Sequence, residues 1–411
     1  QKNAVQMRVR DAVNLIFMQQ SLRKIAFEPA WFWPSMSTLY RTGFSALMAA
    51  LLAAGCAGSP EAPNATRTPT PGPVPALELT KNPEEFTLVF GGDTHFQWGV
   101  AELQQSRGML APVERIRPIF AQSDFRVLNL ETTLSDRGQP YVQKSYIFNS
   151  SPDNIQALRH LNLDLALLGN NHSMDMGKEG LELTIRYLRQ AGIASVGAGV
   201  DLSQAASPYV FERDGVRFAI LSFSMIGESN IFAGERRPGV ALGEKRLVLR
   251  RVAEARREAD LVIVSLHWGH EYYNQPDAQQ VSFARRLIDS GAKAVIGHHP
   301  HVPQGVELYR GGVICYSLGN FVFGSVNEFQ QNNILARLEV NKKKKRIERI
   351  RVLPISGIYR DAGHAVGPLP ADQNRIFWQD FYALLEQLSP ATARRFRVED
   401  NGTAVISVQG K

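Results

Sequence analysis

Short apolar runs recur through the middle of the chain, and glycine or polar residues follow each of them. The runs are five to seven residues long and mostly apolar. Such continuous runs predict β-strands that are covered on both faces, as in a sheet between two other layers. The predicted strands are residues 86–91, 125–131, 163–169, 217–223, 261–267, 293–297 and 313–317.

Helical periodicity occupies several of the intervals between these runs. Residues 178–190 place apolar side chains three or four positions apart, and Gly192 follows as a stop signal. Residues 247–258 are amphipathic and basic, and residues 276–289 form a third predicted helix. Strands that alternate with helices indicate an α/β fold built from layers.

The pattern changes after Gly324. Two segments alternate apolar and polar residues on either side of the basic run 342–346, which predicts an antiparallel pair joined by an exposed turn. We expect residues 84–330 to form the main domain and residues 331–411 to complete the fold as a small α+β extension. The expected strands and helix of this extension are residues 333–340, 347–353, 373–388 and 404–408.

The first segment of the chain predicts export and lipid attachment. Residues 36–56 combine a short basic part around Arg41, an apolar stretch too short for a comfortable membrane span, and small residues before Cys56. This arrangement is typical of a bacterial lipoprotein signal with Cys56 as the lipidated residue, and an uncleaved anchor helix is the alternative. Because Met36 is a natural start for such a signal, residues 1–35 are treated as a doubtful upstream segment.

Residues 57–83 are rich in Pro, Thr, Ala and Gly, which predicts an extended tether. With a lipid on Cys56, the tether would hold the protein on the outside of the membrane, in the cell envelope. The formal net charge is +7, but much of it comes from residues 1–56, so no nucleic-acid partner is expected. Cys315 lies in an apolar run and is expected to be a buried small hydrophobe, with no disulfide framework.

Seven of the nine histidines lie in four short motifs, and each motif follows an apolar run. The motifs are Gly-Gly-Asp93-Thr-His95, Gly-Asn-Asn171-His172, His267-Trp-Gly-His270-Glu271 and Gly-His298-His299-Pro-His301. Imidazole and carboxylate groups that meet at strand ends are what a transition-metal site requires. This clustering is the strongest functional signal in the sequence.

Two of these motifs also predict directions. Asp93 and His95 are two positions apart, so on an extended chain they point the same way and can reach one ion. A turn aspartate beside a surface histidine is the alternative. Because a residue before proline favours extended geometry, we expect His299 and His301 to face one side together and His298 to face the other.

Other polar residues at strand ends have two interpretations each. Glu131 could supply a second, bridging carboxylate, or it could face solvent. Of Asn170 and Asn171, one amide oxygen is a candidate metal ligand and the other residue a candidate for a turn. His172 is a candidate proton donor. Glu271 is a candidate partner that fixes an imidazole tautomer.

Three further residues at strand ends complete the sequence-based description of the site. Trp268 is expected to pack in a wall, His270 is expected to be exposed, and Asn320 either lines a pocket or forms a turn.

Together these strings resemble the CapA family, which is associated with poly-γ-glutamate capsule synthesis. Similar Gly-Asp, Asn-Leu-Glu, Asn-Asn-His, His-Trp-Gly-x-Glu and Gly-His-His-Pro-His-Val strings occur in that family in this order. The resemblance covers roughly residues 86–324. It implies a branch of the calcineurin-like metallophosphatase superfamily, with a four-layer α/β/β/α sandwich and two divalent metal ions, Mn, Fe or Zn.

The resemblance also implies roles for individual residues. The implied metal ligands are Asp93, His95, Glu131, Asn171, His267, His299 and His301. Glu131 would stand where the superfamily has a bridging aspartate, and His172 would be the proton donor or face the phosphate. The chain departs from the superfamily in one respect, because Asn-Leu-Glu131 replaces the Gly-Asp-x-x-Asp motif and the longer carboxylate changes the metal spacing.

The expected function is that of a lipid-anchored, metal-dependent hydrolase acting in capsule or other surface-polymer biosynthesis. Two cations about 3.5–4 Å apart would activate water for attack on a phosphoester or a γ-glutamyl amide. The expected partners are an anionic surface polymer or its precursor, the membrane, and membrane capsule synthase subunits. A non-catalytic, polymer-binding accessory subunit is one alternative. A secreted nucleotidase that stacks its base on Trp268 and Tyr272 is a remoter one.

Overall fold

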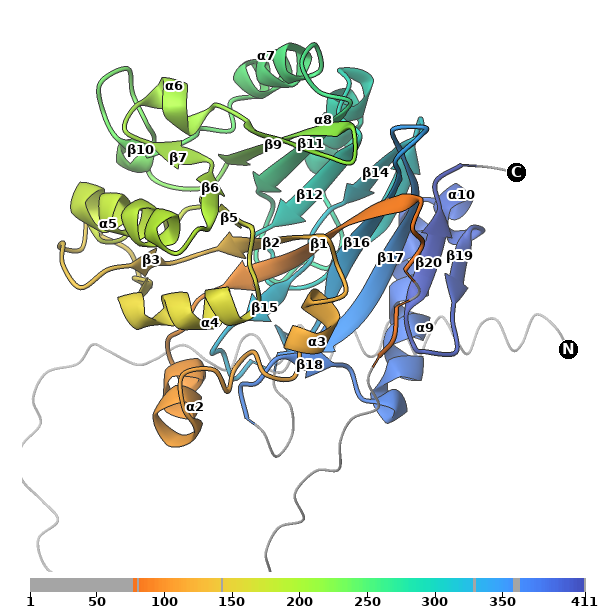
Figure 1. Cartoon of the computed structure of the whole chain (residues 1–411), viewed down its shortest axis with the longest axis horizontal. Coiled ribbons are helices and arrows are strands. Elements are labelled where there is room, and N and C mark those ends of the chain that lie inside the picture. The colour runs from red at the N-terminus through yellow and green to blue at the C-terminus, as the bar shows by residue number, and fades with distance from the viewer. Residues whose placement is uncertain (1–76, 80, 142, 328–329, 358–362, 410–411) are drawn as a thin grey trace, which may run out of the picture. The chain divides into compact units, whose positions relative to one another are not determined.

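Two β-sheets lie face to face in the part of the chain that the computed structural model describes, namely residues 77–79, 81–141, 143–327, 330–357 and 363–409 (Figure 1). The predicted signal segment, Cys56 and the tether up to residue 76 lie outside the described residues.

The first sheet is mixed and has ten strands. Its order is β19-β20-β17-β16-β1-β2-β5-β6, with β15 paired to β1 and β18 paired to β17. Strand β1 (Glu85–Thr94) pairs in parallel with β2 and antiparallel with β16, so it joins a parallel half to an antiparallel half. The other strands are β2 (Phe125–Leu130), β5 (Leu165–Leu167), β6 (Ala194–Val196), β15 (Asn320–Val322), β16 (Asn332–Asn341), β17 (Arg346–Ser356), β18 (Gly367–Pro368), β19 (Phe396–Val398) and β20 (Ala404–Ser407).

The second sheet has six strands in the order β13-β14-β12-β11-β9-β8. Strands β9, β11, β12 and β14 run parallel to one another, and β8 and β13 are antiparallel edges. The bounds are β8 (Tyr209–Arg213), β9 (Val216–Ser224), β11 (Leu261–His267), β12 (Ala294–His298), β13 (Val306–Tyr309) and β14 (Gly312–Cys315).

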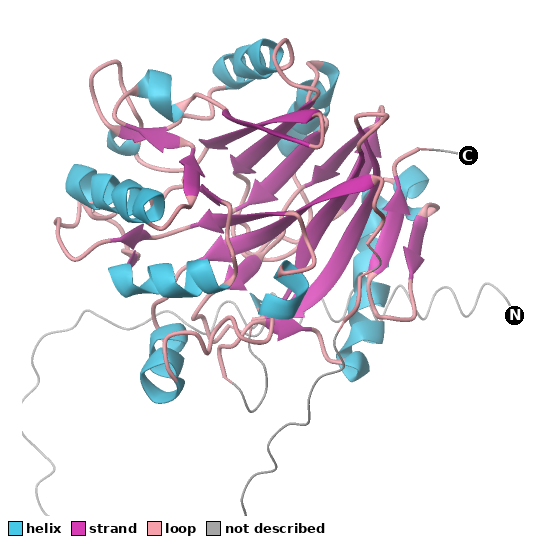
Figure 2. Ribbon diagram, in the orientation of Figure 1, coloured by secondary structure: helices cyan, strands magenta, loops and turns pink. Residues whose placement is uncertain are grey.

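Helices cover the outer face of each sheet, as Figure 2 shows. Helices α3 (Arg117–Phe120), α4 (Ile155–His160) and α5 (Gly177–Gln190) pack on the first sheet, with Phe120, Leu158 and Leu188 in one apolar cluster with Leu128. Helices α7 (Lys245–Ala255) and α8 (Ala278–Asp289) pack on the second sheet, through Val248, Phe283 and Leu287.

A third apolar cluster fills the space between the two sheets. It joins Phe90 and Val127 of the first sheet to Phe218, Ile263 and Ile296 of the second. Alternate residues of each strand therefore face the partner sheet and the helices, as a sheet buried on both faces requires. The layers run helix, sheet, sheet, helix, which confirms the four-layer α/β/β/α sandwich predicted from the sequence.

Helix α9 (Ala371–Leu388) closes one end of this inner core, where Trp378, Phe381 and Leu385 are buried. The predicted antiparallel pair is also confirmed, because β16 and β17 pair over their length and the lysine-rich run forms the turn between them. The C-terminal strands extend the first sheet, since β16 lies directly against β1. Cys315 is buried, and burial raises the pKa of its thiol to about 12.

Local signals explain where several helices begin. The Asp277 side chain accepts a hydrogen bond from the Gln280 N–H, and the Gln280 side chain in turn accepts one from the Asp277 N–H, which caps α8 at its start. The Glu244 carboxylate accepts from two backbone N–H groups at the start of α7. Glycine at position 192 has a φ of 76° after α5, which is the left-handed geometry that ends a helix.

Shorter elements connect the layers. None of the helices in the described part of the chain is both long and apolar enough to cross a membrane. The remaining elements are α2 (Gly99–Arg107), β3 (Thr133–Leu134), β4 (Asn149–Ser150), η2 (Pro152–Asn154), β7 (Ala198–Gly199), α6 (Leu202–Ala205), η3 (Ser229–Ile231), β10 (Gly239–Val240) and α10 (Pro390–Ala393).

Replacing Phe218 with alanine should test the core between the sheets. Phe218 is fully buried, and its ring centroid lies 5.3 Å from that of Phe86 and 4.9 Å from that of Phe211. We expect the free energy of unfolding to fall by about 3–5 kcal/mol, because the substitution leaves a cavity in close-packed surroundings. Urea unfolding measures the change. Val398→Ala, at an exposed edge-strand position, is the control and should stay within about 0.5 kcal/mol of the parent.

Candidate metal centre

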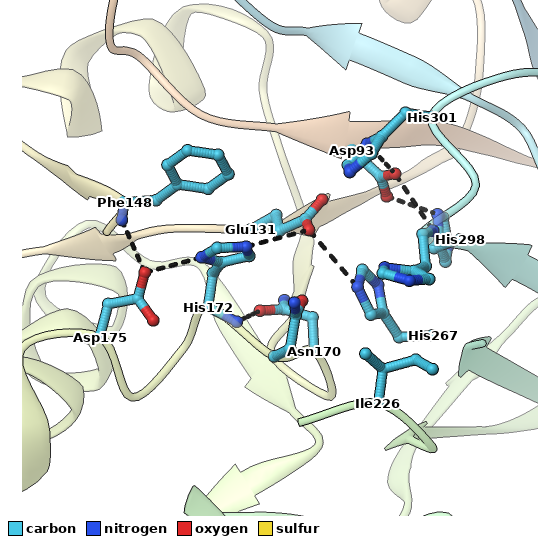
Figure 3. A network of polar contacts seen from close by, with 12 residues as sticks. Asp93, Glu131, Phe148, Asn170, His172, Asp175, Ile226, His267, His298 and His301 are labelled. Atoms are coloured by element: carbon cyan, nitrogen blue, oxygen red, sulfur yellow. Dashed lines mark hydrogen bonds and ion pairs between the residues drawn. The ribbon is translucent and has the colours of Figure 1, made fainter. Parts of the chain in front are cut away.

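The polar motifs meet where the parallel strands of both sheets end. Asp93 lies near the end of β1, Glu131 follows β2, and Asn170 follows β5, while His267 and His298 are the last residues of β11 and β12. Parallel strands present their carboxyl ends at one edge of a sheet, and ligand sites form there. Because the two sheets are packed face to face, the two sets of side chains converge (Figure 3).

Asp93 forms the centre of one half of the cluster. Its Oδ2 lies 3.1 Å from His301 Nδ1, and its Oδ1 lies 3.5 Å from His298 Nδ1. The Asn129 amide donates to Asp93 Oδ1 at 2.8 Å, and the His299 backbone N–H donates to Oδ2 at 3.2 Å. Both carboxylate oxygens are therefore held in place by neighbours from β2, from β12 and from the loop after β12.

Gly92 makes this position of Asp93 possible. A Cβ atom at residue 92 would lie 1.8 Å from the backbone oxygen of Gly319, which accepts a hydrogen bond from the Asp93 N–H. Only glycine permits so close an approach between β1 and the turn before β15.

Glu131 forms the centre of the other half. Its Oε1 lies 3.4 Å from His267 Nε2 and 3.9 Å from His172 Nε2 (Figure 3). Its side chain is fully buried, so the interpretation of Glu131 as a solvent-facing residue is wrong.

Among the described residues, three overlapping groups from this cluster could each hold a metal ion. Within each group, the candidate ligand atoms lie within 4.8 Å of one another. Since the groups share members, they form one continuous cluster that spans the two halves. The groups are Glu131, His267 and His299; Asp93, Glu131 and His301; and Glu271, His299 and His301.

The pairing of the polar atoms indicates that the residues fit a divalent metal. Both carboxylate oxygens of Glu131, Nε2 of His267 and Nδ1 of His299 are buried and have no hydrogen-bond partner. The Oδ1 of Asn171 is in the same condition. Buried polar atoms without partners cost free energy, and bound cations would supply partners for them. Nitrogen and oxygen donors in this mixture suit Mn, Fe or Zn.

The electrostatics of the cluster support the same conclusion. Burial raises the pKa of Glu131 well above its usual range, and the Asp93 carboxylate adds to the effect. Burial lowers the pKa of His299 to about 3, and the charge of His301 acts in the same direction. Burial also acts against a charge on His301, but the carboxylates of Glu131 and Asp93 outweigh it and raise its pKa to about 9. A cation bound near Glu131 and Asp93 would take the place of the proton that these two carboxylates stabilise on His301.

His172 is held in one orientation beside this cluster. Its Nδ1 lies 2.7 Å from Asp175 Oδ2, which also accepts a hydrogen bond from the Phe148 N–H at 2.6 Å. The ring stacks on Phe148 at a centroid distance of 4.0 Å. Lys144 forms an ion pair with Asp175 and donates to the backbone oxygen of Asn171 at 2.9 Å. The imidazole is thus fixed with Nε2 toward Glu131.

Sequence reasoning missed the roles of Lys144 and Asp175. Asp175 follows His172 by three residues, and that spacing in a short loop was the available signal. Nothing in the sequence around Lys144 marks it, because it reaches the site from a separate loop.

The structure assigns different positions to the two neighbouring asparagines. Asn170 is fully buried, donates to Asn129 Oδ1 and to the Leu130 backbone oxygen, and accepts from the His172 N–H. It therefore supports the loop. Asn171 keeps a buried, unpaired Oδ1, as stated above, so it is the one of the pair whose amide oxygen remains available to a ligand.

His95 and Glu271 lie at the border of the cluster. The His95 ring packs between Phe148 at 4.4 Å and Phe323 at 4.0 Å, and its buried Nε2 has no partner, but it belongs to none of the three groups. Glu271 is exposed and belongs to one group. Its carboxylate lies within 4.8 Å of the ring nitrogens of His299 and His301, and among the described residues it makes no hydrogen bond to either ring.

The expected geometry of the triple-histidine string is wrong in two respects. His299 and His301 have φ values of 97° and 58°, so the string turns sharply and is not extended there. His298 stays in strand register opposite His267 and points toward Asp93, although the sequence placed it on the other side (Figure 3). The tight turn lets all three rings approach the site. Asn320 also lines it, with Oδ1 at 2.9 Å from His301 Nδ1.

A cavity of about 320 Å³ opens beside the cluster. His172 and His301 line its inner part, and the exposed Glu271 also belongs to its lining. Trp268 does not, because it is 1% exposed and stacks on Tyr316 in the core behind β11. The expectation of wall packing for Trp268 is confirmed, and its alternative role in base stacking is wrong. His270 is exposed, as expected, and lies 3.8 Å from Asp277.

Residues 87–325 match the model of a family described as the bacterial capsule synthesis protein PGA_cap. The chain belongs to this family. The match confirms the CapA resemblance predicted from the motifs.

Several relatives carry related names. The chain is 28% identical over 323 residues to the PGA biosynthesis protein CapA of Bacillus subtilis, covering 78% of this chain and 82% of that one. It is 31% identical over 247 residues to the capsule biosynthesis protein CapA of Bacillus anthracis, covering 58% and 60%. It is 36% identical over 211 residues to a probable polyglutamine synthesis accessory protein of Mycobacterium tuberculosis, covering 49% and 56%. The chain thus spans less than two thirds of the last two proteins.

Solved structures share the general shape at low sequence identity. A phosphatase of Mycoplasma pneumoniae is 16% identical with a TM-score of 0.43, covering 73% of this chain and 99% of that one. A 5'-nucleotidase precursor of Thermus thermophilus is 16% identical with a TM-score of 0.42, covering 77% and 61%. Neither match bears on the chemistry of the site.

Proposed function

We propose that this member of the capsule synthesis family is a metal-dependent hydrolase of surface-polymer biosynthesis. The observation that carries the proposal is the buried convergence of unpaired carboxylate, amide and imidazole atoms beside an open cavity. The bond cut is a phosphoester or a γ-glutamyl amide. Two divalent ions, Mn, Fe or Zn, would be held by Asp93, His95, Glu131, Asn171, His267, His299 and His301.

The ions would supply Lewis acidity, which activates a water molecule and polarises the substrate oxygen. The chain's own contribution is orientation and proton transfer. His172 presents Nε2 toward Glu131 and would protonate the leaving group, because Asp175 and Phe148 fix its ring. Glu271, at the open side, would orient the substrate together with Tyr272, which lines the same cavity.

The same proposal includes a place in the cell and a set of partners. Lipidation of Cys56 and the tether that follows would anchor the protein at the outside of the membrane, in the cell envelope. The partners would be an anionic surface polymer or its precursor and the subunits of a membrane capsule synthase. The names of the Bacillus relatives support a role in capsule biosynthesis.

A second candidate is a non-catalytic accessory subunit that binds the polymer for the synthase. Two observations favour it. The mycobacterial relative is named an accessory protein, and Glu131 replaces the aspartate motif of the phosphatases.

Metal removal tests the enzyme proposal. Protein treated with a chelator should lose hydrolysis of a phosphoester or a γ-linked polymer, and Mn²⁺, Fe²⁺ or Zn²⁺ should restore it. The temperature of thermal unfolding should rise with added metal. The free energy of unfolding should increase by about 2.7 kcal/mol at a hundredfold excess of metal over Kd. If no substrate of either class is turned over with any of these ions, the enzyme proposal fails.

Alanine at both His299 and His301 separates the two candidates in the producing cell. A hydrolase would lose its contribution to the capsule. Normal capsule from the double variant, with the variant protein present at the parent level, would favour the accessory role.

A further inference from the structure

The cavity beside the metal cluster has a second part, which none of the proposed ligands occupies. Its outer lining comes from α2 and the residue before it, from the loop before β4, and from the segment after β15. It joins the inner part at His172 and His301, so a molecule bound in it would touch both the outer lining and the reacting site. A cavity of about 320 Å³ falls at the lower end of small-molecule sites.

Exposed aromatic side chains dominate this outer lining. Trp98, Tyr146 and Tyr272 are 41%, 60% and 51% exposed, although large aromatic residues gain most from burial. The Trp98 ring nonetheless packs against Tyr146 at 5.7 Å and against Phe323 at 6.0 Å, and the Tyr272 ring lies 6.3 Å from that of His301. The cavity therefore presents preformed apolar ring surfaces to solvent.

The backbone is strained at two of these residues. Trp98 and Tyr272 have φ values of 57° and 65°, which non-glycine residues rarely adopt. Gly324 makes the position of Trp98 possible, because a Cβ atom there would lie 2.1 Å from the Gln97 backbone oxygen. Strain that the surrounding structure maintains is typical of ligand-binding positions.

The charges in the lining select against an anionic ligand. Glu102 and Glu271 carry the carboxylates of the lining, and none of its described residues is a lysine or an arginine. Lys144, which contacts His172, is already paired with the buried Asp175. A γ-glutamyl chain carries one carboxylate per residue, and in the outer part these carboxylates would meet Glu102 and Glu271 with no lysine or arginine beside them, since His172 and His301 lie at the inner end.

We infer that the outer cavity binds an uncharged sugar ring of the substrate. Aromatic faces pack against the apolar C–H faces of a sugar, while Glu102, Glu271 and Gln330 offer acceptors and donors for its hydroxyl groups. The inference rests on the proposed hydrolase function and makes it more specific. The reacting bond would then be a phosphoester carried by a glycosyl unit, since a phosphate beside the metal cluster needs no lysine or arginine in the outer cavity.

Binding, which needs no turnover, tests the inference on the metal-loaded full chain. The probes are methyl glucoside, methyl N-acetylglucosaminide, a γ-glutamyl trimer and tetramethylammonium. Saturation-transfer NMR reports which ligand protons contact the protein, and titration gives the affinity. We expect the glycosides to bind through their ring C–H protons, and the trimer and the ammonium ion to compete weakly or not at all.

Trp98→Ala and Tyr146→Ala should each weaken glycoside binding about tenfold, as the loss of one stacking surface predicts. Tyr146→Ala should disturb the fold less than Trp98→Ala, because the side chain of Tyr146 is more exposed than that of Trp98. Tyr382→Ala, an exposed aromatic position on α9, is the matched control and should leave affinity unchanged. Circular dichroism checks that each variant is folded.

Three results would overturn the inference: no glycoside binding, tighter binding of the trimer or the ammonium ion that depends on Trp98, or glycoside binding that Tyr146→Ala does not affect. The proposed function fails separately. Glycoside binding without any metal-dependent turnover would refute the hydrolase and leave the cavity assignment standing, whereas turnover without glycoside binding would do the reverse.

Discussion

Replacing Glu131 with glutamine is expected to abolish tight binding of divalent metal while leaving the metal-free protein at least as stable as the parent. Both oxygens of the Glu131 side chain are buried and have no hydrogen-bond partner, and burial raises the pKa of this carboxyl well above its usual range. The buried carboxylate therefore lowers the stability of the metal-free protein and raises the affinity for a cation. Metal analysis after dialysis measures the first effect, and thermal unfolding with and without Mn²⁺ measures the second.

The thermal shift on metal addition should disappear in Glu131→Gln. Glu114→Gln provides the matched control, because Glu114 is an exposed glutamate whose ion pair with His160 spans 3.3 Å. That variant should keep the metal content and the shift of the parent. Full metal occupancy in Glu131→Gln would contradict the assignment of this residue to the metal centre. A large loss of stability in the metal-free variant would contradict the claim that the buried charge of Glu131 contributes to metal binding and destabilises the metal-free fold.

Replacing His172 with alanine should lower turnover by about 10²–10⁴-fold, the usual contribution of a positioned general acid. Metal content should not change, because His172 approaches the cluster only at 3.9 Å from Glu131. The fold should tolerate the change, since Asp175 keeps its ion pair with Lys144 and its hydrogen bond from the Phe148 N–H. Steady-state kinetics and metal analysis on the same preparation measure both quantities.

His270→Ala is the control for this experiment. His270 lies in the same motif as His267, but its side chain is 73% exposed and its nearest ionic partner is Asp277. It should leave turnover and metal content unchanged. If His172→Ala also lost its metal, His172 would act as a ligand, and the general-acid role would need another residue.

The order of strands and helices followed from local patterns. The apolar runs ending at His267 and near Asp93 became β11 and β1, because strands this apolar are stable only when both faces are covered. The two alternating segments on either side of the lysine-rich turn became the antiparallel pair β16 and β17. Alternation with a period of two residues predicts a strand, because successive side chains point to opposite faces of the sheet. The partner of β16 was not readable, since pairing with β1 joins residues more than 200 positions apart.

For the candidate site as well, local patterns predicted one part and left another part open. Motifs at strand ends predicted that Asp93 and His267 lie together, because the carboxyl ends of parallel strands gather at one edge, and they left Glu131 open between a bridging carboxylate and a solvent-facing residue. The motifs did not predict the direction of each side chain beyond the end of its strand. The rings of His299 and His301 depend on a backbone turn with positive φ at both residues, which no residue type in that string signals.

By itself, the sequence determined the layered α/β class, the family, and the residue types that gather at the strand ends, because these depend on hydrophobic period and on local strings. The tertiary structure alone decided which side chains face one another. It placed His298 beside Asp93, anchored His172 through Asp175 and Lys144, and assembled an aromatic, acidic cavity next to the cluster. The physical reason is that such contacts join loops distant in sequence, whose directions are fixed only when the two sheets pack together.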